Sequence, residues 1–335
     1  MNVSLKPLHE QVMVITGASS GIGLATARMA AKQGARVVLA SRNPDALEVI
    51  VTQIERDGGK ATFVDADVGN RNDIEQIAQI ANQHFGGFDT WVNNAGSSIW
   101  GRVEDSSDED NRQLFETNFW GVVYGSVTAA RHLRKRGGGA IINLGSVASD
   151  MAFPYMGFYS ATKHAVKAFT DALRIDLEME KAPISVTLIK PTGIDTPFAQ
   201  HTKNYTGKEA RLPDPVYHPD EVANAICHAA VRPQRDIYVG GAAYATSWMN
   251  EMSPRAMDWL RENVFAKQEL HDRPPRSPEG TLHRPGKGGR VRGGHDSYVM
   301  KTSLYTRASL HPVLTSLALG AGAAAIAWMS RSHRA

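Results

Sequence analysis

The sequence of 335 residues has very little cysteine: Cys227 is the single one, which excludes an intrachain disulfide. It also lacks a charged start followed by an apolar core and a small-residue cleavage site, the pattern of a secretory signal. A chain without disulfides suits a reducing compartment, where thiols stay reduced. We therefore expect the main body of the protein to be cytoplasmic.

A large excess of positive charge is also missing from residues 1–266. From Lys267 onward there are 11 Lys and Arg residues against 4 Asp and Glu, whereas residues 1–266 hold 26 basic and 30 acidic residues. The net charge of +3 therefore comes from the C-terminal tail, and the main domain is slightly acidic. Because a basic patch is the electrostatic footprint of nucleic-acid binding, we expect no nucleic-acid partner.

Apolar runs alternate with helical patterns over about 240 residues. The runs that read as buried parallel strands are Val12–Thr16, Arg36–Ala40, Ala61–Asp65, Thr90–Asn93, Ala140–Leu144, Ile184–Ile189 and Asp236–Val239. The segments with apolar residues at helical spacing are Ile22–Gln33, Pro44–Arg56, Arg71–His84, Asp110–Arg134, Phe158–Glu180 and Pro219–Ala230. This alternation predicts an α/β domain with a doubly wound parallel sheet and a ligand outside the carboxyl ends of the strands.

A glycine-rich stretch, TGASSGIG, joins the first predicted strand to the first predicted helix. Gly17 permits a tight turn, and Gly21 and Gly23 let the backbone and the helix approach a pyrophosphate. The positive end of the helix dipole favours that negative charge. The strand before and the helix after the stretch are the context that a dinucleotide site requires, so we expect one here. Its lining would comprise Gly17, Ser19, Ser20, Gly21, Ile22 and Gly23.

Tyr159 and Lys163 stand four residues apart in a predicted helix, so both side chains leave one face of it. A fixed cation beside a phenol favours the phenolate and brings its pKa toward the working range of an acid–base catalyst. Ser146, at the end of a predicted strand, would orient a substrate oxygen. On an exposed helix this spacing also arises without function, and Ser146 could merely end its strand.

These motifs together resemble the short-chain dehydrogenase/reductase family, over residues 8–241. The segments that carry the resemblance are Thr16–Gly23, Asp67-Val68, Asn93–Gly96, Asn118, Ser146, Tyr159 with Lys163, and Pro191–Thr196. The resemblance implies a single Rossmann-type catalytic domain with about seven parallel strands. It also implies that Tyr159 is the general acid–base, that Ser146 polarises the substrate oxygen, and that Lys163 lowers the Tyr159 pKa and holds the nicotinamide ribose. Asn118 would position a water for proton relay, or could instead only bridge backbone groups.

The second predicted strand ends in Ser41 and Arg42, where a carboxylate would favour NAD(H). A hydroxyl and a guanidinium there favour the 2′-phosphate of NADP(H), unless Arg42 is only a solvated loop charge. Further cofactor contacts are expected from Asp67, Val68, Asn94, Ala95, Gly96, Tyr159, Lys163, Pro191, Thr192, Ile194 and Thr196. Thr192 stands where the family usually has glycine, which leaves the contacts of its loop open.

A covering loop over the substrate is expected at Pro197–His218, by resemblance to the family. The apolar side chains Phe153, Pro154, Tyr155, Met156, Phe158 and Phe198 could line a pocket for a lipophilic alcohol or ketone. They could equally be core or dimer packing. The apolar faces of Asp110–Arg134 and Phe158–Glu180 usually pair across a two-fold axis in this family, so a homodimer or homotetramer is expected.

The C-terminal part departs from the family pattern. We divide the chain into a catalytic domain at 1–244, a helical extension at 245–272, a flexible Pro/Gly/Arg-rich linker at 273–300 and an apolar segment at 301–335. One helix is expected over Ala245–Leu270. Pro312–Met329 is uncharged, and its length is close to the ~17-residue lower limit for a bilayer span. It is either an anchor on the cytosolic face of a membrane or a docked apolar helix.

The sequence thus predicts an NADP(H)-dependent oxidoreductase that transfers a hydride between nicotinamide and a lipophilic alcohol or ketone, with no metal site. The alternative is a catalytically idle NADP(H)-binding protein that acts as a redox-sensing scaffold. The presence of Ser146, Tyr159 and Lys163 together favours the enzyme.

Overall fold

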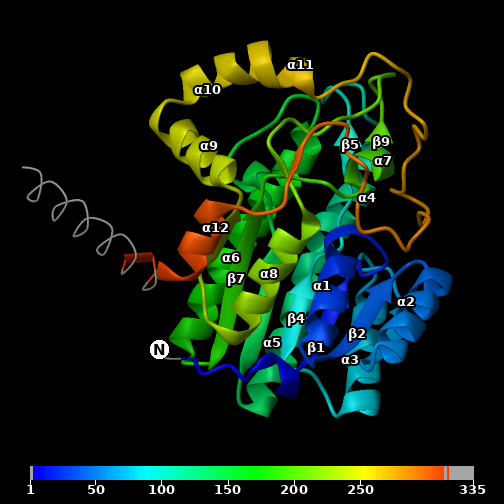
Figure 1. The fold of residues 1–335 in the computed structure, drawn as a ribbon, viewed down its shortest axis with the longest axis vertical. Helices are drawn as coiled ribbons and strands as arrows, with labels where there is room; N and C mark the ends of the chain where they lie inside the picture. The colour runs from blue at the N-terminus through cyan, green and yellow to red at the C-terminus, as the bar shows by residue number, and fades with distance from the viewer. Residues whose placement is uncertain (1–2, 313–314, 317–335) are drawn as a thin grey trace, which may run out of the picture.

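A seven-stranded parallel sheet forms the centre of the protein, as seen in a computed structural model that describes residues 3–312 and 315–316 (Figure 1). In spatial order its strands are β11 (Asp236–Val239), β7 (Ile184–Pro191), β6 (Gly139–Leu144), β4 (Thr90–Asn93), β1 (Val12–Thr16), β2 (Arg36–Ser41) and β3 (Lys60–Asp65). The central strands are buried on both faces, which explains their continuous apolar runs. The predicted doubly wound α/β fold is confirmed.

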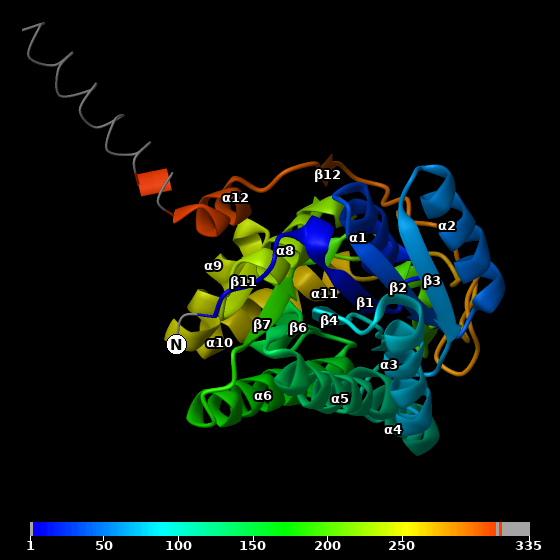
Figure 2. The same ribbon diagram turned by 90° about the horizontal axis from the view of Figure 1, so that it is seen from below.

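Helices cover both faces of this sheet (Figure 2). On one face lie α1 (Gly21–Lys32), α2 (Pro44–Arg56) and α8 (Pro219–Val231). On the other lie α3 (Arg71–Phe85), α5 (Gly121–Arg136) and α6 (Gly157–Met179). Each layer buries the apolar stripe of its helices against the sheet, and the helix spacing read from the sequence corresponds to these elements.

The predicted helix Asp110–Arg134 has an interruption. It consists of α4 (Asp108–Phe115), a π-helical turn over Glu116–Trp120, and α5. Such π-bulges insert an extra residue into a helix and occur frequently at functional sites. This one holds Asn118, whose side chain is completely buried.

The C-terminal extension lies over the end of the sheet where the strands finish (Figure 1). It comprises α9 (Gly241–Met252), α10 (Pro254–Leu260), a π-helical turn over Arg261–Phe265, and α11 (Ala266–Gln268). The sequence predicted one helix over Ala245–Leu270, but the chain bends at Ser253, which has φ −148° and ψ 75°. The bend precedes Pro254, because proline disfavours the helical conformation in the residue before it.

Residues 273–300, here called the tail segment, lie against the catalytic domain, although their composition predicted a flexible linker. Gly21 N donates to the Arg290 carbonyl at 2.9 Å, and Gly289 N donates to the Ser19 carbonyl at 2.8 Å. Its last strand, β12 (Val299–Met300), pairs with β10 (Val216–Tyr217). Backbone hydrogen bonds hold the segment, and these do not depend on the apolar periodicity that sequence reasoning uses.

The short helix α12 (Leu304–Leu310) follows the tail segment and packs near β11 and α8. Among the described residues, no helix has both the length and the apolar character needed to cross a membrane. The predicted membrane segment Pro312–Met329 lies outside the described residues except for positions 312, 315 and 316.

A buried ion cluster fixes the loop that follows β6. The Asp150 carboxylate lies 3.1 Å from Lys190 Nζ on β7 and accepts a hydrogen bond of 2.8 Å from the Tyr238 hydroxyl on β11. Lys167 of α6 also donates to it. Burial acts to raise the pKa of Asp150, but these partners outweigh burial and hold its pKa below the usual value. Four elements are thereby tied together beside the end of β6.

We expect Asp150→Ala to lower the free energy of unfolding by about 3–5 kcal/mol, because it leaves the Lys190 ammonium buried without its partner. Urea denaturation followed by circular dichroism measures the change. Asp108→Ala is the matched control, since its ion pair with Arg112 is exposed and should contribute less than about 1 kcal/mol. Equal losses in the two variants would show that the buried cluster does not stabilise the fold.

Candidate active site

Two contiguous cavities lie at the carboxyl ends of the strands. The first has a volume of about 200 Å³ and the second about 160 Å³. Residues common to both walls are Ile22, Asn94, Gly96, Thr196 and Phe198. The two cavities therefore form one groove, at the edge where the strand–helix alternation predicted a ligand.

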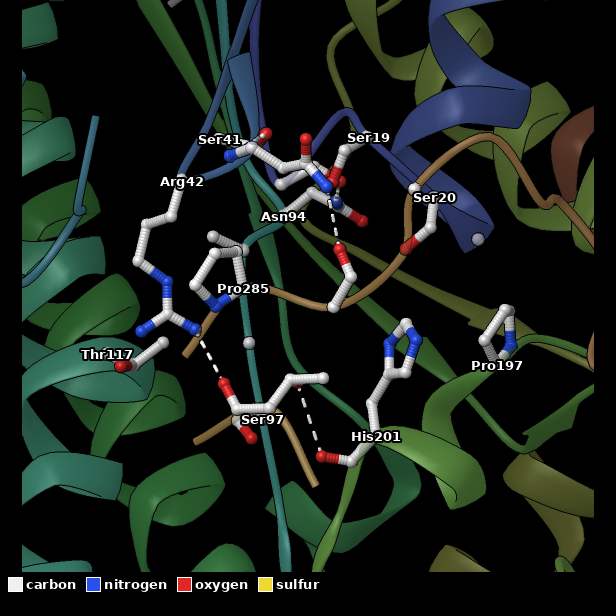
Figure 3. Close-up of a pocket in the computed structure, with 18 of the residues that line it drawn as sticks. Ser19, Ser20, Ser41, Arg42, Asn94, Ser97, Thr117, Pro197, His201 and Pro285 are labelled. Carbon is white, nitrogen blue, oxygen red and sulfur yellow. Dashed lines mark hydrogen bonds between the residues drawn. The ribbon is translucent and has the colours of Figure 1, made fainter. Parts of the chain in front are cut away.

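The first cavity collects most of the predicted dinucleotide-binding residues (Figure 3). Those in its wall are Gly17, Ser19, Ser20, Gly21, Ile22, Ser41, Arg42, Asp67, Val68, Asn94, Ala95, Gly96 and Thr196. Gly23 lines neither of the two cavities, because it packs against the preceding turn: a side chain there would collide with the Gly17 carbonyl oxygen. Gly17 has φ +64°, a conformation that glycine adopts without strain.

The glycine-rich turn is fastened to the end of β4. Thr16 Oγ1 accepts hydrogen bonds from the backbone N–H groups of Asn94 and Ala95 at 3.0 and 3.1 Å. The Asn94 side chain donates to the Thr16 carbonyl at 2.9 Å. These bonds hold the two loops together as one wall of the groove.

Arg42 points across the first cavity to the tail segment (Figure 3). Its guanidinium donates to the carbonyl oxygens of Thr281 at 2.6 Å and Leu282 at 3.0 Å, and it lies 3.7 Å from an Asp67 carboxylate oxygen. Sequence reasoning missed this contribution of the tail segment, whose residues in the cavity wall are Thr281, Pro285, Gly286, Lys287 and Gly288. No motif or spacing indicated it.

The second cavity brings together Ser146, Tyr159 and Lys163. Ser146 starts a short turn after β6, and its hydroxyl oxygen accepts a 3.1 Å hydrogen bond from Ala148 N. Lys163 Nζ donates to the Leu144 carbonyl at 2.7 Å and lies 5.7 Å from the centre of the Tyr159 ring. Both helical side chains leave α6 on one face, as the four-residue spacing predicts.

Burial controls the protonation of this pair. It raises the pKa of Tyr159 to about 12, although the Ser146 hydroxyl acts in the opposite direction, and it lowers the pKa of Lys163 to about 8. The predicted lowering of the Tyr159 pKa by Lys163 is therefore not found in this structure. The energetic cost of a desolvated phenolate exceeds what its neighbours supply, so Tyr159 is a neutral phenol that can donate a proton.

Asn118 lines neither of these two cavities. Its amide nitrogen donates to the Ser97 carbonyl at 3.0 Å and to Thr162 Oγ1 at 3.1 Å, and its amide oxygen accepts from Ser97 N at 2.8 Å. The side chain thus connects the loop after β4 with α6. These contacts show that Asn118 bridges backbone groups, and its water-positioning role stays a prediction.

The loop after β7 lies in the wall of the second cavity with Pro191, Thr192, Ile194 and Thr196. Thr192 takes the place of the usual glycine, and its N–H donates to the Val239 carbonyl at 3.1 Å. The next two residues form β8 (Gly193–Ile194), which pairs with β10. The loop therefore accommodates Thr192 within regular backbone pairing.

The apolar wall of the second cavity includes part of the predicted set. Phe153, Met156 and Phe198 line it, whereas Pro154, Tyr155 and Phe158 do not. Phe198 starts α7 (Phe198–His201) in the predicted covering loop, and its ring lies 5.5 Å from the Tyr159 ring between centres. Leu212 and Pro213 complete this side.

Glu269 from the C-terminal extension also lines the second cavity, and sequence reasoning did not single it out. Its side chain is completely buried, and neither carboxyl oxygen has a hydrogen-bond partner among the described residues. Burial raises its pKa to about 8. Because a lone glutamate at the end of a helix belongs to no motif, no signal in the sequence could have found it.

Comparison with known proteins agrees with this geometry. The sequence profile described as short chain dehydrogenase matches residues 11–206. An uncharacterized oxidoreductase of Bacillus subtilis, YxnA, is 42% identical over 330 residues, which span 97% of this chain and 92% of that protein. An uncharacterized oxidoreductase of Staphylococcus saprophyticus is 33% identical over 68% of this chain and 92% of its own length.

Two solved structures share the fold. L-Sorbose reductase from Gluconobacter frateurii, complexed with NADPH and L-sorbose, has a TM-score of 0.62 and 27% identity, covering 72% of this chain and 98% of its own. A short-chain dehydrogenase/reductase from Burkholderia phymatum in complex with NAD has a TM-score of 0.66 and 26% identity, covering 81% and 99%. The present chain is an oxidoreductase that belongs to the short-chain dehydrogenase/reductase family.

Proposed function

We propose that the protein is an NADP(H)-dependent oxidoreductase that transfers a hydride between nicotinamide and a lipophilic alcohol or ketone. The observation that carries the proposal is the gathering of Ser146, Tyr159 and Lys163 in one cavity that continues into the glycine-lined cavity. Carbonyl reduction requires a hydride donor and a proton donor at one carbonyl group, and a dinucleotide that runs along the first cavity would bring its nicotinamide end into the second, beside Tyr159.

The first cavity offers a dinucleotide the hydroxyl groups of Ser19 and Ser20 and a turn at Gly17 that lets backbone approach closely, while Gly21 N already donates to the Arg290 carbonyl. Residues 19–22 would hold the pyrophosphate at the start of α1, where the helix dipole favours negative charge. Lys163 and Thr192 would hold the nicotinamide half, because both line the second cavity. When bound, the nicotinamide supplies the hydride.

Tyr159 would donate the proton to the substrate oxygen during reduction, since its raised pKa keeps it a neutral phenol. The Ser146 hydroxyl lies beside it in the cavity wall and would orient the same oxygen. Lys163, with a pKa lowered to about 8, would stabilise the phenolate that remains after transfer. In the oxidation direction the same groups work in reverse.

NADP(H) is preferred in this proposal because Ser41 ends β2 and Arg42 follows it, and both line the first cavity. The solved relatives were obtained with NADPH in one case and NAD in the other, so the preference has to come from this chain's own residues. Lys287 of the tail segment adds a second cation to the wall that holds Arg42. Two cations at this place favour a 2′-phosphate.

The substrate is proposed to be largely lipophilic, because Val147, Phe153, Met156, Phe198 and Leu212 line the cavity that holds Tyr159. Apolar walls bind apolar substrate surface by excluding water from it.

A catalytically idle redox-sensing scaffold is the alternative, and it gives no reason for a proton donor, a polarising hydroxyl and a cation to share one cavity.

A homodimer or homotetramer is part of the proposal. Ile175 and Met179 on α6 are 52% and 78% exposed, and Trp120 before α5 is 40% exposed. These helices form the outer layer on one face of the sheet (Figure 2). Large apolar side chains left exposed on a helix layer favour a partner that buries them.

We expect Tyr159→Phe to lower kcat for ketone reduction by about 10²- to 10⁴-fold, because the substrate oxygen loses its proton donor. Steady-state assays of NADPH oxidation measure kcat, and NADPH fluorescence titration verifies that the cofactor still binds. Tyr155→Phe is the control, since Tyr155 lies in the same segment but lines neither of these cavities. Full turnover in Tyr159→Phe would remove the catalytic assignment.

We expect Arg42→Ala to raise the NADPH Kd by about 10- to 100-fold, the value of a charge-assisted hydrogen bond, and to leave the NADH Kd nearly unchanged. Fluorescence titration with each nucleotide gives the two constants. Arg28→Ala serves as control because Arg28 is exposed on α1 and contacts Gln53 instead. Equal losses for both nucleotides would mean that Arg42 acts through the tail segment and does not read the phosphate.

Attachment to the cytosolic face of a membrane through residues 312–329 stays a prediction from the sequence. A chain ending at His311 keeps α12 and tests it, because the structure shows α12 packed near β11 and α8. If the segment is an anchor, fractionation of cells will find the full chain with the membranes and the truncated chain in the supernatant. The same distribution for both chains would contradict the anchor.

A further inference from the structure

The Glu269 carboxyl is a polar group that neither the fold nor the proposed chemistry uses. It is completely buried in the wall of the cavity that holds Tyr159 and Ser146, and neither oxygen is hydrogen-bonded among the described residues. Burying such a group without a partner costs free energy, and native proteins rarely leave one without a reason. A ligand that enters the cavity is a partner that would supply the missing bonds.

The backbone around Glu269 is satisfied without its side chain. Glu269 N donates to the Phe265 carbonyl at 3.1 Å, and the Glu269 carbonyl accepts from Arg211 N at 2.8 Å. The neighbouring Leu270 forms a bridge with Ala210. These bonds hold the extension against the covering loop, so an apolar residue of similar size would serve the fold as well as glutamate does.

We infer that Glu269 is a specificity-determining residue that binds a hydroxyl group of the substrate, separate from the oxygen at which the reaction takes place. The inference rests on the proposed function, and it narrows the substrate class to hydroxy ketones and the corresponding diols with an otherwise apolar body. The same cavity wall includes the side chains of Phe198, Leu212 and Pro213, which offer no hydrogen bond.

The chemistry of the carboxyl selects a hydroxyl. With its pKa raised to about 8, Glu269 is mostly neutral at neutral pH and presents one O–H donor together with acceptor oxygens. A hydroxyl also donates one hydrogen bond and accepts others, so it satisfies both sides of the carboxyl. A ketone oxygen would satisfy only the donor, and an alkyl chain would satisfy neither.

The position of Glu269 separates recognition from reaction. Tyr159 and Ser146 belong to α6 and to the turn after β6, within residues 11–206 that match the family profile. Glu269 follows α11, outside that match. The extension therefore adds a polar contact to a cavity whose proton donor comes from the family domain. The similarity to the Bacillus subtilis relative spans 97% of this chain, so it includes the extension.

The test compares methyl ketones of increasing chain length with the same ketones carrying a terminal hydroxyl. We expect the wild-type protein to show a kcat/KM with NADPH that is at least about tenfold higher for the hydroxylated member at one chain length, because the plain ketone leaves the carboxyl unpaired. Glu269→Leu should reduce this ratio to about one, and Glu269→Gln, whose amide also donates and accepts, should keep part of it.

Glu262→Leu is the matched control, since Glu262 is exposed in the same extension, and its ratio should equal that of the wild type. Urea denaturation separates recognition from a structural role: Glu269→Leu should be at least as stable as the wild type, because it removes a buried unpaired carboxyl. A loss of stability in both Glu269→Leu and Glu269→Gln would assign Glu269 to the fold and overturn the inference.

Calorimetry with the matched alcohols and diols, in the presence of NADPH, measures recognition without turnover, because the reduced cofactor cannot accept a hydride from an alcohol. If no ketone is reduced but diol binding depends on Glu269, the proposed reaction fails and the inference stands. If ketones are reduced but Glu269→Leu changes neither the kinetic ratio nor the diol affinity, the inference fails and the reaction stands. An absence of preference in the wild-type protein at every chain length, in kinetics and in calorimetry, also overturns the inference.

Discussion

The parallel direction of the seven strands is the constraint on which the rest of the structure depends. Because every strand runs the same way, the loops after β1, β2, β4, β6 and β7 all emerge at one edge of the sheet. Side chains more than a hundred residues apart in sequence, such as Ser41 and Ser146, therefore line one groove. The loop after β7 and the C-terminal part form the remaining walls of the groove.

Two kinds of interaction hold the loops around the groove in place. Asp150, Lys190 and Tyr238 form a buried polar cluster that ties the turn after β6 to neighbouring strands. The tail segment is held by hydrogen bonds to backbone, as between Gly21 and Arg290. Polar groups that are fully paired in this way specify one arrangement, because each alternative arrangement leaves some of them unpaired. The site thus depends on polar pairing as well as on apolar packing.

Burial gives the second cavity its chemical character. It favours the uncharged form of Tyr159 and of Glu269 and lowers the pKa of Lys163. The spacing of Tyr159 and Lys163 alone predicted a Tyr159 pKa lowered toward the working range of an acid–base catalyst. The degree of burial, which comes from the surrounding elements, decides the protonation state that the spacing leaves undetermined.

The sequence by itself determined the sheet and its helices, and its resemblance to the family implied that the glycine-rich turn meets Ser146, Tyr159 and Lys163. It could do so because strand and helix periodicity and the motifs between them are local properties of the chain. Only the tertiary structure decided that Arg42 contacts Thr281, that Asn118 is used in bridging, and that Glu269 enters the cavity. Those contacts arise from side-chain hydrogen bonds to distant backbone carbonyls and from burial, and neither produces a periodic pattern in the sequence.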